Sequence, residues 1–172
     1  MKALVPLDGS DNAFRIFSTV RSLLALQPAI EIHLLEVLDP HSVKGRNEHA
    51  IEGIPSVAVG KVSISSPGPR LVESHGAAME RVAGETTFAL KDLAEREIPE
   101  AQSFAHVAWS DQPSRAIKDL SDELDVDVVV MATHGRSGLS HLVAGSVTEA
   151  VIRHSHRPVL VQGPAAAAAS NP

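Results

Sequence analysis

A glycine-rich loop that follows a buried strand is the part of this sequence best suited to bind an anion. The apolar run Val126–Ala132 leads into a loop with Gly135, Gly138 and Gly145, and a helix is predicted from Ser146. Glycines let backbone amides approach a ligand closely, and a helix N-terminus adds unpaired N–H donors with a partial positive charge. This combination predicts a cradle for an anion, most often phosphate. The loop alone leaves a second interpretation open, in which the glycines only form tight turns of a strand–loop–helix connection.

Side chains in and beside the loop extend this prediction. Ser146 and Glu149 have the spacing of a capping box, which favours a helix start at Ser146. His134 lies inside the loop, where its imidazole N–H could donate to phosphate. Arg136 could also approach a phosphate, although a single loop arginine is often only solvated.

A second candidate loop, Val5-Pro-Leu-Asp-Gly-Ser10, follows the first predicted strand. Ligands of open parallel sheets bind beyond the carboxyl ends of the strands, where the winding direction reverses. If the first and fourth strands are neighbours, Asp8 faces the glycine loop there. A bare carboxylate would repel phosphate, so a functional Asp8 needs a sugar hydroxyl or a divalent cation as its partner. The alternative is that Asp8, Gly9 and Ser10 simply form a turn and a helix cap.

Several standard catalytic signatures are absent from the sequence. There is no G-x-x-x-x-G-K-[ST] motif and no G-x-G-x-x-G after the first strand, and Ser10 and Ser146 do not lie in a G-x-S-x-G elbow. The nine histidines are scattered, and only His154 and His156 lie within two residues of each other. We therefore predict neither a histidine metal site nor a Ser–His–Asp triad.

Short apolar runs and helix-like segments alternate along the chain, which predicts right-handed crossovers and a parallel sheet. The expected strands are Ala3–Leu7, Ile30–Leu38, Ser103–Trp109, Val126–Ala132 and Pro158–Gln162. The expected helices are Asp11–Leu26, Leu71–Glu97, Pro113–Leu124 and Ser146–His154. The first of these helices carries Phe17, Val20 and Leu24 on one face.

Composition indicates one globular domain that can bury a sizeable core, because the chain has 172 residues of which 44% are hydrophobic. The net charge of −6 disfavours a broad nucleic-acid-binding surface. No apolar run approaches the roughly 20 residues that span a bilayer, and the N-terminus is read as a strand rather than a signal peptide. The absence of cysteine excludes disulfides and thiolate chemistry. We expect a soluble, cytoplasmic protein.

Two segments depart from the alternating pattern. Residues 41–69 mix glycine, proline, serine and charge around the weak apolar pieces Val57–Val59 and Val62–Ile64. This segment is longer than a usual connection and is predicted to be a mobile surface insertion, with a lid as the alternative. Residues 163–172 contain five consecutive alanines and are predicted to form a disordered tail. The domain itself is expected to span residues 1–162.

An ordered set of motifs resembles the universal stress protein family over nearly all of residues 1–162. The matching segments are Leu4-Val-Pro-Leu-Asp-Gly-Ser10, Leu34-Leu-Glu-Val37, Gln112-Pro-Ser-Arg-Ala-Ile117 and Pro158-Val-Leu-Val161. The family's nucleotide motif, G-x2-G-x9-G-[ST], here reads Ala132-x2-Gly135-x9-Gly145-Ser146. The motif's first glycine is therefore replaced by alanine, whose extra methyl group could crowd a close ribose or phosphate contact.

The resemblance implies an α/β fold with an open five-stranded parallel sheet in the order 3-2-1-4-5 and helices on both faces. This is the Rossmann-like arrangement of adenine nucleotide alpha hydrolase-like proteins. Its last strand, Pro158–Gln162, would lie at a sheet edge without a charge to discourage pairing. Both the edge and the resemblance lead us to expect a homodimer joined there, unless the alanine-rich tail covers the edge.

The resemblance also implies a binding site for ATP or a related adenine nucleotide with Mg²⁺ or Mn²⁺, where Asp8 is a possible metal ligand. Pro6, Leu7 and Asp8 would line the ribose side, and the backbone of Val37 would contact the adenine edge. The residues carried over to the phosphate side are Ala132, His134, Gly135, Arg136, Ser137, Gly138, Gly145, Ser146, Val147 and Thr148.

The expected function is that of a nucleotide-dependent switch in a stress response, which signals through an unidentified protein partner. No base, nucleophile or arginine finger is evident, so at most slow ATP hydrolysis is expected. The alternatives are a dimeric interaction module that binds no nucleotide, and a slow ATPase.

Overall fold

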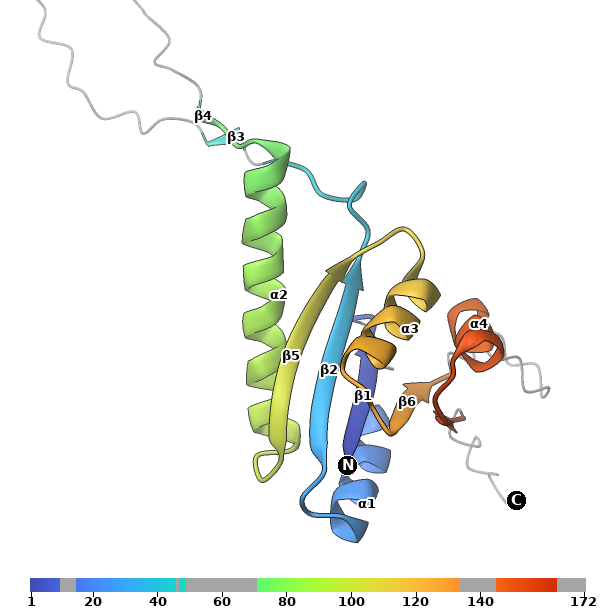
Figure 1. Ribbon diagram of the computed structural model, residues 1–172. Helices are drawn as coiled ribbons and strands as arrows, with labels where there is room; N and C mark the ends of the chain where they lie inside the picture. The colour runs from blue at the N-terminus through green and yellow to red at the C-terminus, as the bar shows by residue number, and fades with distance from the viewer. Residues whose placement is uncertain (10–14, 46, 49–70, 134–144, 164–172) are drawn as a thin grey trace, which may run out of the picture.

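A five-stranded parallel sheet forms the centre of the molecule in the computed structural model, which describes residues 1–9, 15–45, 47–48, 71–133 and 145–163 (Figure 1). Its strands are β1 (Lys2–Leu7), β2 (Glu31–Leu38), β5 (Gln102–Trp109), β6 (Val128–Ala132) and β7 (Val159–Gln162). They are arranged in the order β5-β2-β1-β6-β7. This order confirms the predicted sheet, with β1 between β2 and β6 and with β5 and β7 at the edges.

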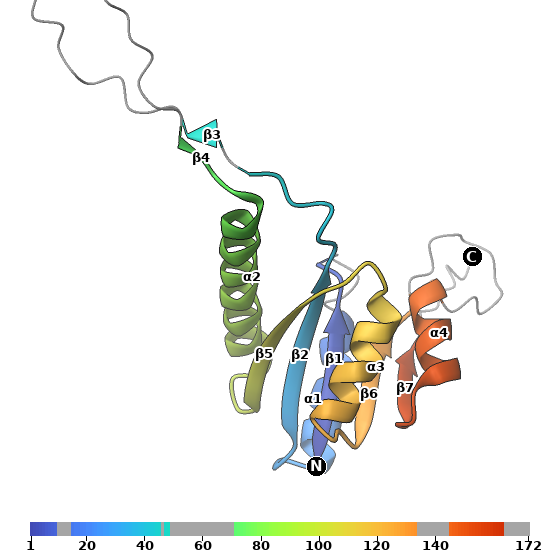
Figure 2. The same ribbon diagram turned by 45° about the horizontal axis from the view of Figure 1, so that its top comes forward.

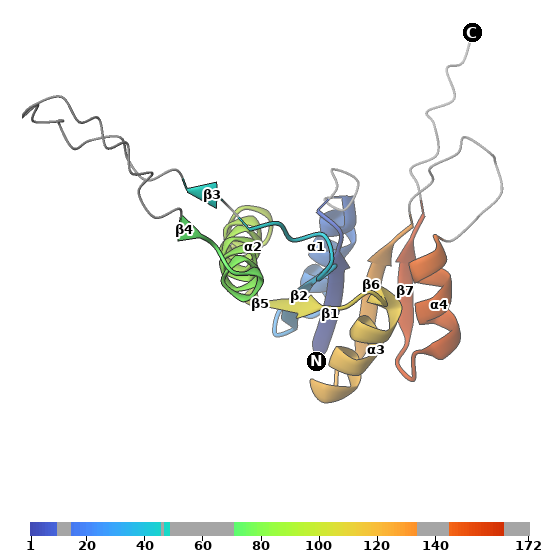
Figure 3. The same ribbon diagram turned by 90° about the horizontal axis from the view of Figure 1, so that it is seen from above.

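Four helices in the described part of the chain cover the two faces of the sheet. They are α1 (Ile16–Leu26), α2 (His75–Glu97), α3 (Pro113–Glu123) and α4 (Ser146–His154). Seen from above, α1 and α2 lie on one side of the sheet and α3 and α4 on the other (Figure 3). None of the described helices combines the length and apolar character needed to cross a membrane.

Alternation along the strands produces a separate apolar core on each face. Val5 and Leu7 of β1 pack into the core beneath α1 and α2, whereas Leu4 packs into the core beneath α3 and α4. The predicted stripe on α1 is confirmed, because Phe17, Val20 and Leu24 are all buried in the first core. The central strand β1 is thus held from both faces, which fixes the position of its carboxyl end.

The start of α2 differs from the sequence prediction. The helix begins at His75, whereas Leu71–Val72 form the short strand β4, which pairs antiparallel with β3 (Asn47–Glu48). Ser74 is the N-cap residue, with extended backbone, and its hydroxyl accepts a hydrogen bond from the Ala77 amide at 3.1 Å. A capping serine therefore starts the helix later than its apolar periodicity suggested.

The two-residue ladder between β3 and β4 brings together the ends of the predicted insertion. Gly45 supports this closure, because a Cβ atom there would lie only 2.6 Å from the Glu73 carbonyl oxygen. The apolar pieces Val57–Val59 and Val62–Ile64 lie outside the described residues, as do most of the predicted insertion and residues 164–172 of the predicted tail. Whether the insertion is mobile or forms a lid stays a prediction.

Other boundaries differ from the predicted ones by one to five residues. The α-helix α1 begins at Ile16, after Arg15, while residues 10–14 lie outside the described part of the chain. Strand β6 begins at Val128 rather than Val126, and just before it the Asp127 carboxylate accepts a hydrogen bond from the Lys2 amide at 2.6 Å. Pro158 lies just outside β7, since its ring nitrogen carries no hydrogen for the ladder.

Candidate functional site

The carboxyl ends of β1 and β6 meet where the winding of the sheet reverses, and we call this place the switch point (Figure 2). The chain runs outward from β1 through β2 to β5 and then returns to the other side of β1 as β6. Registered pairs between the two central strands are Ala3–Val128 and Leu4–Val129, in their amino-terminal halves. The residues that end β1 lie beyond these pairs, at the location where open parallel sheets bind ligands.

Helix α4 begins at this same edge with Gly145 as its N-cap residue. The first hydrogen bond of the helix joins the Glu149 amide to the Gly145 carbonyl oxygen at 2.9 Å. The amides of Ser146, Val147 and Thr148 lie ahead of this bond and are therefore not used by the helix ladder. A helix start of this kind attracts an anion through both free donors and the helix dipole.

The capping box predicted for this helix is wrong. Ser146 is the first helical residue rather than the cap, and the cap residue Gly145 has no side chain to accept a hydrogen bond. Glu149 forms an ion pair with Arg153 one turn further along. Gly145 occupies the cap instead, and no described atom lies within 4 Å of where its Cβ would be. Packing among the described residues thus leaves the helix start open on that side.

A carboxylate that the sequence analysis did not single out lies beside the first loop. Glu36 is half-buried and pairs with Leu7 across the β1–β2 ladder. Its Oε1 atom lies 3.4 Å from where a Cβ on Gly9 would be, and Gly9 has a φ of +68°, which favours glycine. Burial, and then the charge of Asp8, raise the pKa of the Glu36 carboxyl. Two acidic side chains therefore lie next to the end of β1.

Gln162, at the end of β7, fixes the residues that lead into the glycine loop. Its carbonyl oxygen accepts hydrogen bonds from the Thr133 amide at 2.9 Å and the Thr133 hydroxyl at 3.3 Å. Its side-chain oxygen accepts from the Thr19 hydroxyl at 2.9 Å, and its side-chain amide donates to the Ser18 hydroxyl at 3.2 Å. The end of β6 is thereby tied to both β7 and α1.

Some of the predicted site residues lie in the part of the chain that the structure describes, and others lie outside it. On β1, Pro6 is half-buried and Leu7 is buried, and Asp8, directly after the strand, is exposed. On β2, Val37 pairs with Ala108 of β5. The remaining described members are Ala132, Gly145, Ser146, Val147 and Thr148, of which Thr148 is buried. The predicted members outside the described residues are His134, Gly135, Arg136, Ser137 and Gly138.

No group of three or more histidine, aspartate or glutamate side chains in the described ranges is arranged to hold a metal ion.

Replacing Glu36 with glutamine should stabilise the protein at neutral pH. A carboxyl whose pKa is raised by folding contributes stability that is present below its unfolded pKa and lost as the pH rises through its folded pKa. Removal of the ionised group should therefore raise the melting temperature at pH 7 by a few degrees, since 1 kcal/mol corresponds to about 2–4 °C in a domain of this size.

Thermal unfolding followed by circular dichroism at pH 7 and pH 4 measures this effect. The gain from Glu36→Gln should shrink at pH 4, where the wild-type carboxyl is protonated. Glu95→Gln, at an exposed position of α2, is the matched control and should change little at either pH. A lower melting temperature for Glu36→Gln at pH 7 would contradict the account of this side chain.

Comparison with known proteins identifies relatives along nearly the whole chain. The sequence model of the universal stress protein family matches residues 1–162. Universal stress protein MJ0577 of Methanocaldococcus jannaschii is 28% identical over 171 aligned positions, which cover 93% of each chain. A second protein of that organism, universal stress protein MJ0531, is 41% identical over 49 positions, which cover 28% of this chain and 29% of the relative.

Solved structures agree with this match at the level of the fold. The structure of MJ0577 has a TM-score of 0.63 at 23% identity and covers 96% of this chain and 97% of its own. A universal stress protein solved with cAMP has a TM-score of 0.56 at 16% identity, with 95% and 96% covered. One from Archaeoglobus fulgidus solved with dAMP has a TM-score of 0.54 at 18% identity, with 94% and 96% covered. The chain belongs to the universal stress protein family.

Proposed function

We propose that this protein binds ATP or a related adenine nucleotide, together with Mg²⁺ or Mn²⁺, at the switch point and acts as a nucleotide-dependent switch in a stress response. The observation that carries the proposal is the open start of α4 at the same sheet edge as Asp8. The amides of Ser146, Val147 and Thr148 supply donors for phosphate. Universal stress proteins solved with cAMP and dAMP support the choice of an adenine nucleotide.

The charges at the switch point support a requirement for a divalent cation. Asp8 and Glu36 place negative charge next to the end of β1, and this charge would repel the phosphates of a free nucleotide. A divalent cation between them would offset the repulsion and could take Asp8 as a ligand. The residues present thus fit a nucleotide bound with its cation better than a nucleotide alone.

The proposed site also includes motif residues that lie outside the described part of the chain. In the family's pattern, His134, Gly135, Arg136, Ser137 and Gly138 would complete the phosphate side, and Ala132 would begin it. Pro6 and Leu7 would line the ribose, and the Val37 backbone would contact the adenine edge.

The alanine at position 132 favours a second candidate, an interaction module that binds no nucleotide. Ala132 ends β6 and pairs with Gln162 of β7, so its methyl group lies where the motif's first glycine would leave space. This candidate makes a different prediction for nucleotide content but the same prediction for dimerisation.

Changing Ala132 to glycine should leave the affinity for ATP unchanged or raise it. The physical reason is that the substitution removes one methyl group and restores the motif's spacing. Calorimetry of both proteins under one set of conditions gives the ratio of dissociation constants. A lower affinity, in a variant whose melting temperature is unaltered, would show that the Ala132 methyl group contributes favourably to ATP binding.

Turnover of ATP should be negligible. Among the described side chains at the switch point, Asp8 and Glu36 are acidic and no lysine or arginine is placed to stabilise a transferred phosphoryl group. Binding alone does not lower a chemical barrier. Release of phosphate from ATP with Mg²⁺ should therefore stay far below about 1 s⁻¹, the low end of typical enzymes. A rate in that range would make the protein an ATPase.

Nucleotide content of the purified protein separates the two main candidates. Denaturing the protein, removing it and analysing the supernatant by absorbance and mass spectrometry should reveal an adenine nucleotide. A supernatant without nucleotide, from protein that also shows no heat with added ATP, would favour the interaction module.

We also infer a homodimer joined through β7, with signalling through a further protein partner. Strand β7 lies at an edge of the sheet, contains no charged residue, and exposes 38% of Leu160. Ile152, on the neighbouring helix α4, is 48% exposed. An uncharged edge with adjoining apolar side chains favours pairing with a second copy around a twofold axis.

A further inference from the structure

Two histidines 73 residues apart in sequence meet across the other edge of the sheet. His33 of β2 and His106 of β5 approach with 3.0 Å between Nδ1 of His33 and Nε2 of His106. Their ring centroids are 5.2 Å apart, and the ring planes differ by 27°. The ring centroids are thus 2.2 Å further apart (5.2 minus 3.0) than the two nitrogens. The rings therefore meet nitrogen to nitrogen rather than face to face.

The pair is shielded from water mainly on the side of His33. The His33 side chain is only 7% exposed, and Phe104 of β5 stacks on its ring with centroids 4.9 Å apart. The Nε2 atom of His33 is buried and has no hydrogen-bond partner among the described residues. The Oε2 atom of Glu31 is 3.7 Å from this nitrogen, beyond ordinary hydrogen-bond distance. His33 therefore has one firm hydrogen-bonding partner, His106.

The number of protons on the two rings decides whether the His33–His106 hydrogen bond can form. A hydrogen bond between two ring nitrogens needs one donor and one acceptor, so it forms when both rings are neutral. It survives a first added proton, because an imidazolium can donate to the remaining neutral ring. A second added proton makes both nitrogens donors and places two positive charges in contact, which breaks the bond.

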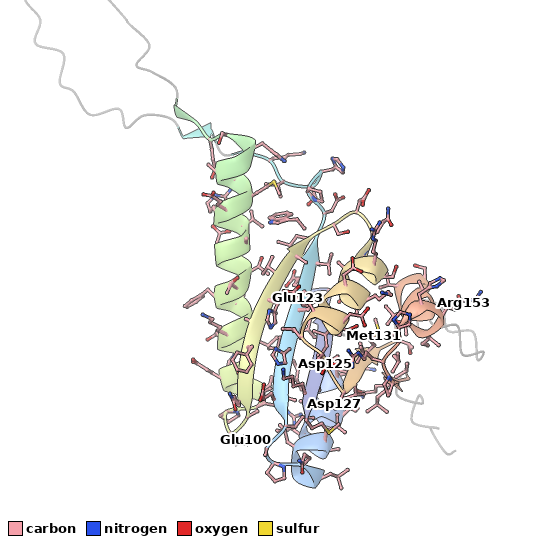
Figure 4. All side chains as sticks on the ribbon, in the orientation of Figure 1. Glu100, Glu123, Asp125, Asp127, Met131 and Arg153 are labelled. Carbon is pink, nitrogen blue, oxygen red and sulfur yellow. The ribbon has the colours of Figure 1, made fainter. Side chains whose placement is uncertain are left out.

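Charges of both signs lie near the pair. Glu31 on β2 and Glu123 at the end of α3 favour protonated histidine, whereas Lys2 on β1 disfavours it. Figure 4 labels Glu123 on the face of the sheet that α3 covers. Burial is the largest influence on both rings and lowers both pKa values, and the charge of His106 lowers the pKa of His33 further. Carboxylates nearby therefore do not compensate for the buried position.

The position of the pair determines what its loss would affect. Strand β5 is an edge strand, joined to β2 along its whole length from Gln102 to Trp109. Helix α2 covers its opposite face (Figures 1 and 3). On the face of the pair, Phe104 is 40% exposed. The His33–His106 bond is thus a side-chain link between the edge strand and the rest of the sheet on its open face.

We propose that His33 and His106 form a proton-sensitive link, which holds β5 against β2 at neutral pH and loosens this edge of the sheet when the pair takes up a second proton. The unfolded chain binds protons at the usual histidine pKa of about 6.5, whereas the folded pair resists them. Stability is therefore fully present above this pH and is lost as the pH falls below it. The device is separate from the switch point and does not depend on nucleotide binding.

Nuclear magnetic resonance on the full chain tests the link directly. Imidazole nitrogen shifts recorded against pH should show His33 and His106 titrating in two coupled steps, both below the usual histidine pKa of about 6.5. Amide hydrogen exchange, corrected for its intrinsic pH dependence, should accelerate in β5 about tenfold more than in β1 between pH 7 and pH 5. Rings that titrate at the usual histidine pKa, or equal acceleration in β1 and β5, would overturn the proposal.

A substitution separates the link from general acid sensitivity. In His106→Gln, the amide oxygen can accept from a protonated His33, so the extra acceleration in β5 at pH 5 should disappear. His41→Gln is the control and should retain the wild-type pH dependence. A His106→Gln protein that loses β5 protection at pH 5 as strongly as the wild type would also overturn the proposal. If this variant fails to fold, the wild-type titration and exchange still decide.

Discussion

Gly145→Val should remove measurable ATP binding, with a loss of affinity of at least a hundredfold, or about 2.8 kcal/mol. Gly145 caps α4, and no described atom lies within 4 Å of where its Cβ would be. Its φ of −55° is accessible to any residue. The described residues therefore leave room for a side chain there, but in the proposed complex a branched side chain would intrude where phosphate approaches the helix amides. Calorimetry with ATP and Mg²⁺ measures the effect.

A matched substitution separates this effect from a general disturbance. Gly84 is an exposed residue in the middle of α2 with no described atom near its Cβ position, so Gly84→Val should bind ATP like the wild type. Gly84→Val should keep the wild-type circular dichroism spectrum, since valine disfavours a helix interior less than glycine does. Gly145→Val replaces a favoured cap residue by a disfavoured one, which should cost about 1 kcal/mol and leave the protein folded. If Gly145→Val binds ATP with wild-type affinity, the phosphates do not lie at the start of α4.

Leu160→Lys should convert the protein from a dimer to a monomer at micromolar concentration. Leu160 lies in the middle of β7, 38% exposed, and a lysine there would place a like charge on both copies across the twofold axis. A buried, unpaired charge at such an interface costs several kcal/mol, enough to dissociate a dimer of ordinary affinity. Light scattering gives the mass of each form.

The control for this experiment is Leu26→Lys. Leu26 ends α1 and is 83% exposed, away from β7, so the same change should leave the dimer intact. A chain that ends at Gln162 tests the alternative in which the alanine-rich tail covers the edge, and it should remain dimeric. A monomeric full-length protein, or a Leu160→Lys variant that is still dimeric, would show that the chain does not dimerise through β7.

The sheet was predictable because its signals are local and repeated. Each strand is an apolar run between helix-like segments, and the family motifs supplied the strand order, which the structure confirms. The buried face of α1 was also predictable, because Phe17, Val20 and Leu24 follow the helical period, and all three are buried. Periodicity, however, does not mark ends, so the start of α2 was placed at Leu71 rather than after Ser74.

The candidate site was less predictable, because it depends on neighbours that the sequence does not order. The capping box failed because Ser146 lies one residue inside the helix, and its motif does not distinguish that position from the cap itself. Glu36 was overlooked in an otherwise apolar strand, although an isolated carboxylate there was a usable signal. The His33–His106 contact depends on the register of β2 with β5, which no local motif specifies.

Isothermal titration calorimetry of the full chain with millimolar ATP, in the presence and absence of Mg²⁺, tests nucleotide binding at the switch point most directly. Binding at the switch point should give saturable heat with one nucleotide per chain, and weaker binding when the cation is removed, because Asp8 and Glu36 then face the phosphates without compensation. Absence of heat with Mg²⁺ present, together with absence of competition against a fluorescent adenine nucleotide, would show that the switch point binds no adenine nucleotide.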